Sequence, residues 1–511
     1  MASSYATASA TAASRDEIAS PAAPPLGLGT RLSYGAGAVV NGVKNAAFTT
    51  YLLFYYNQVV GVPASVVSTA IALTLLVDAF ADPFLGRWSD VTRSRWGRRH
   101  PFIYGAAVPA ALFFALAWFP PAGLGNFGIG VWIFATAALT RMAVSGFEIA
   151  TSAMNPELTE NYRERTRLFS LRYWFGYAGA FGFTAVALST FFASTPEFPR
   201  GQLNPAGYAG FALTGAALVF VAVLVCGLGT HGRIPWLRQA EARSDSPGLA
   251  THLREMLAAF SNRGFLAIFG FGVLKYTAIG VYSGTLLYFG TYLWKLNGGQ
   301  LALLTFDSLV AATIAAPLAP VMSGWLGKRM SSMVFAVGGV ALGLTPLVLA
   351  LNDLFWPTGH PLLVPTLFVN GALYGAMVAI SLINTSSMMA DVVEDSAVKT
   401  GRRDAGTFFA ATSFMQQCSA ALGIFATGVI LSLSGFPEKP APGQVTDAMV
   451  DSLLLHYIPT SMTLWAAGAL ILCFYPITRA RHEANIEVLR AREAEARARE
   501  IDNVPLGGPS R

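Results

Sequence analysis

Long apolar runs without a charged residue are the feature of this sequence that most limits its possible folds. The runs Ala106–Pro120, Phe211–Leu228 and Met462–Tyr475 approach or reach the length that crosses a bilayer. Hydrophobic residues make up 54% of the chain and charged residues only 12%. Because the backbone must satisfy its own hydrogen bonds in lipid, such runs are expected to be helices. The sequence therefore predicts an all-α membrane protein.

The apolar runs predict twelve membrane-spanning helices, six in each half of the chain. They cover residues 33–58, 65–87, 101–121, 126–151, 169–194, 208–230, 264–294, 301–325, 331–352, 361–390, 405–433 and 454–477. The polar stretch between the halves contains two prolines and is expected to be a linker. The expected domains are a disordered tail (1–31), a first bundle (32–230), a linker (231–263), a second bundle (264–477) and a charged tail (478–511).

Basic residues are distributed unequally between the two sets of connections. One set holds eighteen Lys and Arg residues, whereas the other holds only Arg200, Lys295 and Lys439. The positive-inside rule places the basic set, both termini, the linker and the charged tail in the cytoplasm. The expected location is the cell (inner or plasma) membrane, with the lipid bilayer as partner. The net charge of +6 is explained by this topology, so no nucleic-acid partner is expected.

No motif for enzymatic chemistry stands in a convincing context. The cysteines Cys226, Cys418 and Cys473 lie in apolar stretches without a CxxC pair, which favours a packing role. A Gly-rich phosphate loop, a metal-binding His cluster and a nucleophile motif are absent from the sequence. The sequence therefore predicts neither an enzyme nor a cofactor.

The two halves of the sequence contain similar motifs at corresponding helix ends, and four segments carry motifs that are typical of one protein family. Gly86–Asp90 before Gly97–Arg99 has a counterpart in Gly324–Arg329 of the second half. The four segments are Leu32–Gly37, Asp78–Pro83 leading to Arg93–Arg98, Pro156–Thr159 with Glu164–Arg172, and Asp391–Glu394 with Lys399–Arg402. Together they resemble the glycoside-pentoside-hexuronide:cation symporters, the melibiose permease family of the major facilitator superfamily. The resemblance implies two six-helix bundles and uptake of a sugar or glycoside coupled to Na⁺ or H⁺.

The resemblance assigns roles to several charged residues. Asp78 and Asp82 match the helix-two carboxylates of the family's cation site, and would be the metal ligands if the ion is Na⁺. Arg172 matches a helix-five arginine of the substrate site. Glu148 stands where melibiose permease has a sugar-binding aspartate on helix four. Lys44 and Lys275 have no counterpart that aligns clearly.

Other positions depart from melibiose permease. Asn41 and Gly42 replace its helix-one Lys-Asp pair, and Ser152 replaces a stacking tryptophan. Ser413 and Gln417 replace its helix-eleven threonine and lysine. We expect Asn41, Ser152, Ser413 and Gln417 to belong to the substrate site, but the departures argue against recognition of melibiose-type galactosides.

Charges within membrane spans are costly, by about 2.5 to 3.5 kcal/mol each, so each needs a partner or a function. Asp78 and Asp82 are one helical turn apart and should share a helix face, where they could bind a cation or share a proton. Alternatively, Asp82 caps a bend at Pro83. Glu148 could instead form a structural ion pair with Arg141, and Arg172 could be an interfacial residue that reaches to the membrane surface.

Asp90, Arg98 and Arg99 cluster at the cytoplasmic end of helix two. We expect them to form a charge network that gates the state closed to the cytoplasm. The alternative is that their charges only reflect the positive-inside rule.

The function that these patterns favour is cation-coupled symport of a sugar or glycoside by alternating access, in a protein expected to act as a monomer. A lysophospholipid or other amphiphile symporter of the same superfamily is the nearest alternative, because several sugar ligands are missing. An apolar cavity between the bundles would favour that alternative. A non-transporting membrane sensor is the alternative from another class, but a sensor would not need Asp78, Asp82 and Arg172.

Overall fold

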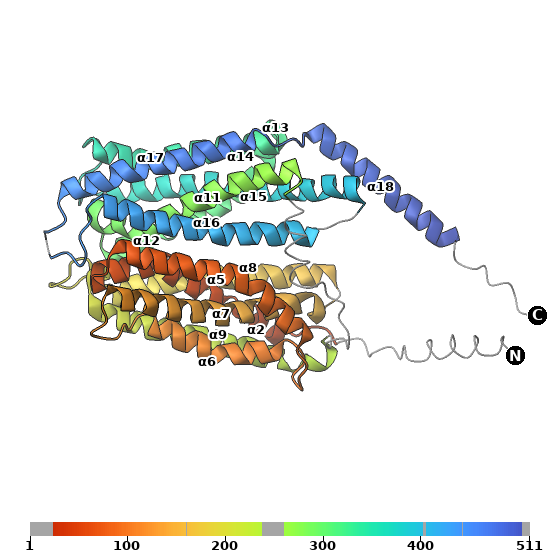
Figure 1. Cartoon of the computed structure of the whole chain (residues 1–511), viewed down its shortest axis with the longest axis horizontal. Coiled ribbons are helices and arrows are strands. Elements are labelled where there is room, and N and C mark those ends of the chain that lie inside the picture. Colours follow the sequence, from red (N-terminus) through yellow and green to blue (C-terminus); the bar gives the residue numbers. More distant parts are fainter. Residues whose placement is uncertain (1–23, 160, 238–259, 402–404, 442, 503–511) are drawn as a thin grey trace, which may run out of the picture.

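The protein is almost entirely helical. A computed structural model describes residues 24–159, 161–237, 260–401, 405–441 and 443–502, and all regular elements within these ranges are helices. Residues 1–23 of the expected tail and 238–259 of the expected linker lie outside the described ranges. Figure 1 shows the helices running side by side in two groups that follow the two halves of the sequence.

The first span is interrupted by π-helical turns, whereas the next five are largely continuous. It consists of α2 (Leu28–Ala36), α3 (Val39–Ala46), η1 (Ala47–Tyr51), α4 (Leu52–Phe54) and η2 (Tyr55–Val60). The others are α5 (Ala64–Val91), α6 (His100–Leu116), α7 (Asn126–Leu158), α8 (Tyr162–Val186) continued by η3 (Ala187–Phe191), and α9 (Pro205–His231). The short helices η4 (Gly201–Leu203) and η5 (Ile234–Trp236) flank α9.

The second half repeats this order. Its spans are α11 (Arg263–Tyr288) continued by η6 (Phe289–Leu293), α12 (Gly298–Leu304) with α13 (Asp307–Leu326), α14 (Lys328–Leu351), α15 (Leu363–Thr400), α16 (Ala405–Leu433) and α17 (Asp447–Leu472). A further helix, α18 (Arg479–Asp502), follows the last span. The first and seventh spans both end in a π-helical turn, η2 and η6, so the similarity between the sequence halves is also found in the structure.

The structure agrees with the expected twelve spans, although the helices extend past the apolar runs. Within the described residues, nine helices are long and apolar enough to cross a membrane, and α6 is a shorter apolar helix. The interrupted first span and α8 with η3, whose first turns are polar, complete the twelve. Helix α2 begins at Leu28, within the expected tail, and α15 continues ten residues past the expected end at 390. Polar residues continue these helices because backbone hydrogen bonding does not require an apolar side chain.

Close backbone contacts join the two bundles. Helix α5 packs against α16 over much of its length. A side chain on Gly428 of α16 would collide with Ser68 of α5, and one on Gly298 would collide with the Leu188 carbonyl. Small residues therefore allow the bundles to approach closely at these two seams.

A set of buried polar side chains closes the end of the molecule opposite to α18. Asn57 accepts a hydrogen bond from the Tyr288 hydroxyl (2.9 Å), and Gln58 donates to the Pro437 carbonyl (3.1 Å). Gln202 donates to the Thr291 hydroxyl at 3.0 Å. These bonds connect the first half to the second, whereas no hydrogen bond or ion pair between described residues joins the halves at the α18 end. Among the described residues, bonds between the halves therefore close the far end, and none is found at the α18 end.

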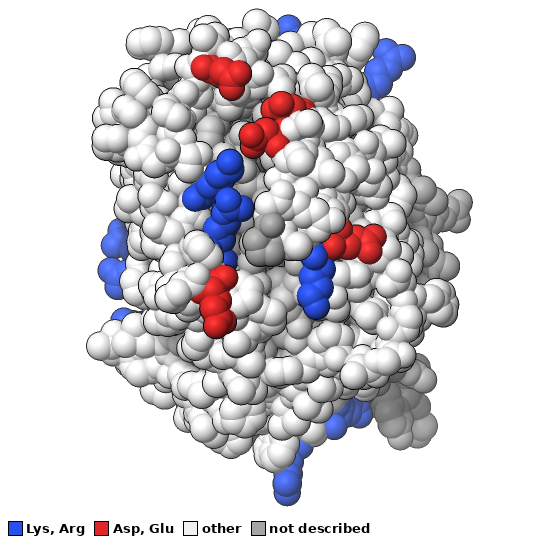
Figure 2. Space-filling model, turned by 90° about the vertical axis from the view of Figure 1, so that its left-hand side faces the viewer, with Lys and Arg blue, Asp and Glu red and all other residues white. Residues whose placement is uncertain are grey.

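The far end of the molecule has few charges. Figure 2 shows this face, on which basic side chains are sparse and scattered among uncharged residues. The basic connections of the sequence, such as the one at Arg98 and Arg99, lie at the other end. This distribution supports, as a proposal, a cytoplasmic α18 end.

We predict that the α18 end is cytoplasmic, because it holds most of the basic residues. In a variant without the native cysteines, a membrane-impermeant maleimide should label Thr358→Cys, in the exposed 352–362 connection, in intact cells. The matched variant Arg95→Cys, in the exposed connection before α6, should react only after permeabilisation. The opposite labelling pattern would contradict the topology.

Candidate functional site

A polar cavity of about 640 Å³ lies between the two halves. It is lined by the first span, α5 and α7 of the first half and by α11 and α16 of the second. Six of the residues expected at the site line it, namely Asn41, Asp78, Asp82, Glu148, Ser413 and Gln417. Arg172 and Ser152 lie beside the cavity, behind Glu148. The structure thus brings together the expected cation and substrate residues.

Asp78 and Asp82 share one face of α5, as their spacing requires. Asp78 accepts a hydrogen bond from the Ser145 hydroxyl (2.9 Å), and its second oxygen lies 3.5 Å from Arg141. Asp82 accepts a hydrogen bond from the Gln417 amide (2.9 Å), which belongs to the other half of the protein. Its other oxygen is buried and has no hydrogen-bond partner among the described residues. Asp82 therefore has an oxygen available to a small hard cation or a proton.

Glu148 is held by Arg172 and not by Arg141. The Arg172 guanidinium donates to the Glu148 carboxylate at 2.6 Å and to the Ser152 hydroxyl at 3.3 Å. Arg172 also lies over the Tyr34 ring, and only 9% of its side chain is exposed. It therefore points into the bundle and does not reach to the membrane surface. The arginine at the aspartate pair is Arg141, so the alternative pairing of Glu148 with Arg141 does not occur in this structure.

Lys44 lines the cavity, although the sequence analysis assigned it no role. Its side chain is buried and lines the cavity with Asn41 and Asn45 of the same span. It forms no hydrogen bond or salt bridge with any residue that the structure describes. A charged residue in an apolar span was a visible signal, but its partners depend on how the helices cross.

Gly42 explains one of the departures from melibiose permease. It faces α8, and a Cβ atom at this position would collide with the Gly176 carbonyl oxygen. The first span therefore packs against α8 backbone to backbone at the point where melibiose permease has a helix-one carboxylate. A side chain at position 42 has no access to the cavity here.

The residues expected at the gate do form a charge network, and its centre is Glu157. Arg99 lies 2.7 Å from Asp90, and Glu157 accepts from Arg98 at 2.6 Å and from Arg99 at 3.2 Å. Only 4% of the Glu157 side chain is exposed. The network joins α5, α7 and the connection between α5 and α6, all of the first half. In this structure the network therefore connects helices within one bundle. Its role as a gate between the bundles remains a proposal.

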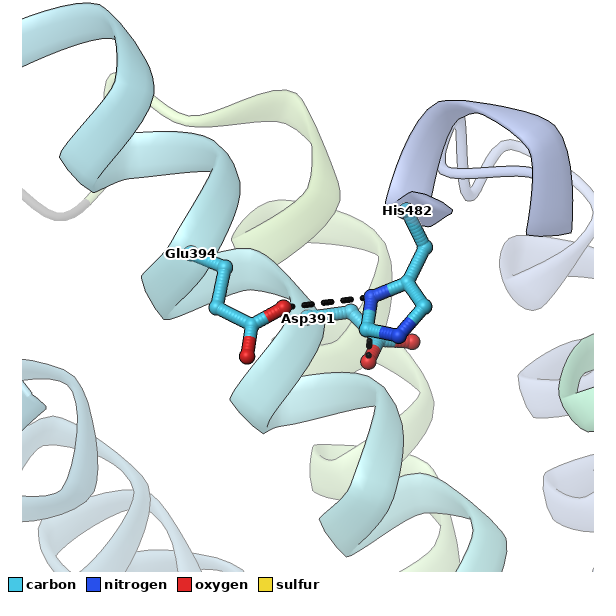
Figure 3. Close-up of side chains that lie close together, drawn as sticks. All are labelled: Asp391, Glu394 and His482. Atoms are coloured by element: carbon cyan, nitrogen blue, oxygen red, sulfur yellow. Dashed lines mark ion pairs between the residues drawn. The ribbon is translucent and has the colours of Figure 1, made fainter. Parts of the chain in front are cut away.

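A second cluster fastens α18 to α15. Figure 3 shows His482 of α18 pointing toward Asp391 and Glu394 of α15, at 3.3 and 3.1 Å. The spacing of these three groups would suit a metal ion. However, both oxygens of Asp391 already accept from Lys328, at 2.7 and 2.9 Å. Lys328 belongs to α14, whereas α18 is attached to α15 by the contacts of His482 and by Arg481, whose guanidinium lies 2.9 Å from the Asp395 carboxylate.

A second cavity between the halves is mostly apolar. It has a volume of about 370 Å³ and lies on the other side of the contact between the first span and α11. Its lining includes Phe181 of the first half and Tyr282, Tyr374, Trp465 and Asp307 of the second. Asp307 accepts a hydrogen bond from Ser308 and forms no ion pair with a described residue.

We predict that Glu157→Gln destabilises the protein far more than Asp90→Asn. Glu157 is buried between two arginines, and removing one partner of a buried ion pair costs about 3 to 5 kcal/mol. Asp90 is half exposed, and exposed pairs contribute about 0 to 1 kcal/mol. Thermal unfolding of both purified variants in the same detergent would measure the difference, and equal melting temperatures would contradict the central role of Glu157.

Proteins of known name that are similar in sequence are transporters. The chain matches the family described as MFS/sugar transport protein over residues 33–479. It is 27% identical to an uncharacterized symporter of Synechocystis sp., in an alignment that covers 91% of this chain and 97% of the relative. It is 26% identical to the isoprimeverose transporter of Lactiplantibacillus pentosus (91% and 92%) and 25% identical to a glucuronide carrier protein homolog of Escherichia coli (88% and 92%).

Solved structures with the same fold are also transporters. The nucleoside transporter NupG superposes with a TM-score of 0.59 at 15% identity, covering 88% of this chain and 99% of its own. The inward-open xylose transporter XylE of E. coli superposes with a TM-score of 0.57 at 14% identity, covering 90% and 98%. These likenesses show the major facilitator fold. With the family match over most of its length, this chain belongs to the sugar transport proteins of the major facilitator superfamily, and the resemblance to glycoside:cation symporters is confirmed.

Proposed function

We propose that the protein couples uptake of a sugar or glycoside to the entry of Na⁺ or H⁺. The observation that carries this proposal is the Asp78–Asp82 pair, which lines a polar cavity between the halves and leaves one Asp82 oxygen without a hydrogen bond. The printed names of the relatives, which include a putative glycoside/cation symporter of E. coli, support it.

Alternating access follows from the arrangement of the two bundles. The far end is closed by Asn57, Gln58 and Gln202 with their partners in the second half, whereas the α18 end lacks such bonds among the described residues. With the termini in the cytoplasm, this state faces inward. The opposite state would require breaking the far-end bonds and bringing the bundles together at the α18 end. The Asp90, Arg98 and Arg99 network lies at that end and is the proposed gate.

The coupling step centres on Asp82. Its hydrogen bond to Gln417 links the proposed ion site of α5 to the substrate face of α16. A cation or proton on Asp82 changes the charge that Gln417 faces, so ion and substrate each alter the other's affinity. This reciprocity is what symport requires.

Sugar hydroxyls would be received by the amides and hydroxyls of the cavity. Asn41 and Gln417 can donate and accept, and Ser413 adds a hydroxyl. Glu148 can accept from a sugar hydroxyl with its second oxygen, which is buried without a hydrogen bond to a described residue. Arg172 would orient Glu148, and Ser152 in turn holds Arg172.

An amphiphile symporter is the second candidate function, and the apolar cavity favours it. That cavity lies between the bundles and is lined by aromatic and aliphatic side chains with Asp307 at its wall. An acyl or aryl group would bury apolar surface there. In this candidate, Asp307 and the cavity around it would be needed for transport.

We predict that Asp82→Asn abolishes ion-driven accumulation but leaves exchange of substrate down its own gradient. The neutral amide takes up no proton and binds Na⁺ far more weakly than a carboxylate does, while Gln417 and the cavity remain. The measurement is uptake of a labelled glycoside panel into proteoliposomes under separate Na⁺ and H⁺ gradients. Asp307→Asn is the matched control, because it removes a half-buried carboxylate outside the polar cavity.

Three outcomes separate the candidates. Loss of accumulation in Asp82→Asn alone supports the proposed coupling site. Accumulation by Asp82→Asn under the same ion gradient would show that the aspartate pair is structural. Loss in Asp307→Asn, together with competition by lysophospholipids, would favour the amphiphile candidate.

We also predict that melibiose binds poorly. Position 42 offers no carboxylate to the sugar, and Gly42 packs against α8 instead of the cavity. Losing a charge-assisted hydrogen bond costs about 1.5 to 3 kcal/mol, which lowers affinity by an order of magnitude or more. Calorimetry with melibiose would test this, and micromolar binding would refute it.

A further inference from the structure

Asp307 is an acidic residue within a membrane span that takes no part in the polar cavity. It begins α13 and lines the apolar cavity, where it is the only Asp, Glu, Lys, Arg or His among the described lining residues. Its hydrogen-bond partner is the neighbouring Ser308, and no described basic residue pairs with it. A carboxylate is costly at such a place, so it must take up either a proton or a cation from outside the chain.

The buried lysine of α11 does not supply the missing positive charge. Lys275 is buried and lies one helical turn before Ala278, which lines the apolar cavity. Its ammonium, however, lies over the rings of Phe271 (4.9 Å) and Tyr276 (4.6 Å), and it forms no ion pair with a described residue. Tyr276 lines the polar cavity and not the apolar one. Asp307 therefore remains without a basic partner in the described part of the chain.

Aromatic rings line the apolar cavity near Asp307. Tyr282 of α11 and Tyr374 of α15 have ring centroids 5.5 Å apart, and both interact electrostatically with Asp307. Gly371 of α15 allows this approach, because a Cβ atom there would collide with the Asp307 carboxylate. A carboxylate beside aromatic rings suits an organic ammonium, since the carboxylate compensates its charge and the rings attract cations. The cavity volume of about 370 Å³ is in the range of small-molecule sites.

The walls of the apolar cavity come from both bundles. Thr50, Phe181 and Thr184 belong to the first half, and Tyr282 and Trp465 belong to the second. In alternating access the bundles move against each other, which changes the distance between these walls. A molecule that contacts both walls binds the present arrangement better than the opposite one. It therefore shifts the protein toward this arrangement.

We infer that the apolar cavity is a binding site for hydrophobic ammonium compounds, with the ammonium group at Asp307 and the apolar part among the aromatic and aliphatic side chains. Such a compound inhibits transport, because it stabilises one arrangement of the bundles. It is bound and not carried, which distinguishes it from the substrate of an amphiphile symporter. The binding is independent of which sugar is transported, and only the inhibition rests on the proposed function.

The binding test uses compounds that share one apolar part and differ in charge, namely 4-phenylbutylamine, 4-phenylbutanol and 4-phenylbutyrate. Equilibrium binding is measured near neutral pH with full-length protein in lipid nanodiscs, and empty nanodiscs correct for partition into lipid. We expect the amine to bind about tenfold more tightly than the alcohol or better, because it gains a charge-assisted hydrogen bond. The butyrate should bind least. Equal binding of amine and alcohol would show that Asp307 takes up a proton instead, and would overturn the inference.

Asp307→Asn should weaken binding of the amine by about tenfold or more and leave binding of the alcohol unchanged, which also shows that the variant is folded. Asp307→Glu keeps the charge and should retain the preference for the amine. Asp353→Asn is the matched control, because it neutralises an exposed carboxylate outside both cavities, and it should bind the amine like wild type. If Asp307→Asn binds the amine as tightly as wild type, the amine binds elsewhere and the inference is wrong.

The inhibition is measured in proteoliposomes. The amine should lower the maximal rate of ion-driven glycoside uptake, and about tenfold more amine should be needed to inhibit Asp307→Asn to the same extent. Uptake that continues at saturating amine, or accumulation of the amine itself, would overturn the inhibitory role. Amine binding in a protein that shows no ion-driven uptake of any glycoside would instead support the site and contradict the proposed function.

Discussion

The requirement that every charge inside the membrane be compensated by another group organises this structure. Asp78 lies against Arg141 and Ser145, and Glu148 lies against Arg172. These pairs come from different helices, so they fix how α5, α7 and α8 face one another. The same rule makes an incompletely paired group informative, because lipid offers it no water. Asp82 accepts a hydrogen bond from the Gln417 amide but forms no ion pair with a described residue, and this distinguishes it from Asp78 although both are on one helix face.

Close helix contacts determine where a cavity can exist. At Gly42 the first span meets α8 with no room for a side chain, and at Gly428 helix α16 meets α5. Contacts of this kind bring the helices together within a bundle or at the closed end, and the cavities lie where larger side chains separate the helices. The polar and apolar cavities lie on opposite sides of the contact between the first span and α11. One helix contact therefore divides the space between the bundles into two chemically different parts.

The sequence predicted the elements of the fold well and the partners of its charges poorly. Hydropathy and helical period are local, so the twelve spans and the shared face of Asp78 and Asp82 could be predicted. Which arginine meets which carboxylate depends on helix crossings, so Arg141 at Asp78 and the central position of Glu157 could not be. The far-end bonds of Asn57 and Gln58 were also missed, because an amide at the end of an apolar run gives no sign of a partner in the other half. Gly42 looked like a lost ligand, and only the structure shows it as a packing contact.

In the proposed mechanism, Asp82 is the residue at which ion binding is coupled to movement of the bundles. Its neighbour Asp78 is bonded only within the first half, to Arg141 and Ser145, whereas Asp82 is bonded to Gln417 of the second half. A rotation of one bundle against the other leaves the surroundings of Asp78 intact but must change the Asp82–Gln417 distance. In this proposal the charge on Asp82 alters the relative energies of the two bundle arrangements, whereas Asp78 acts mainly through its negative charge beside Asp82. Two carboxylates one turn apart can thus have unlike roles, because only one of them contacts the moving partner.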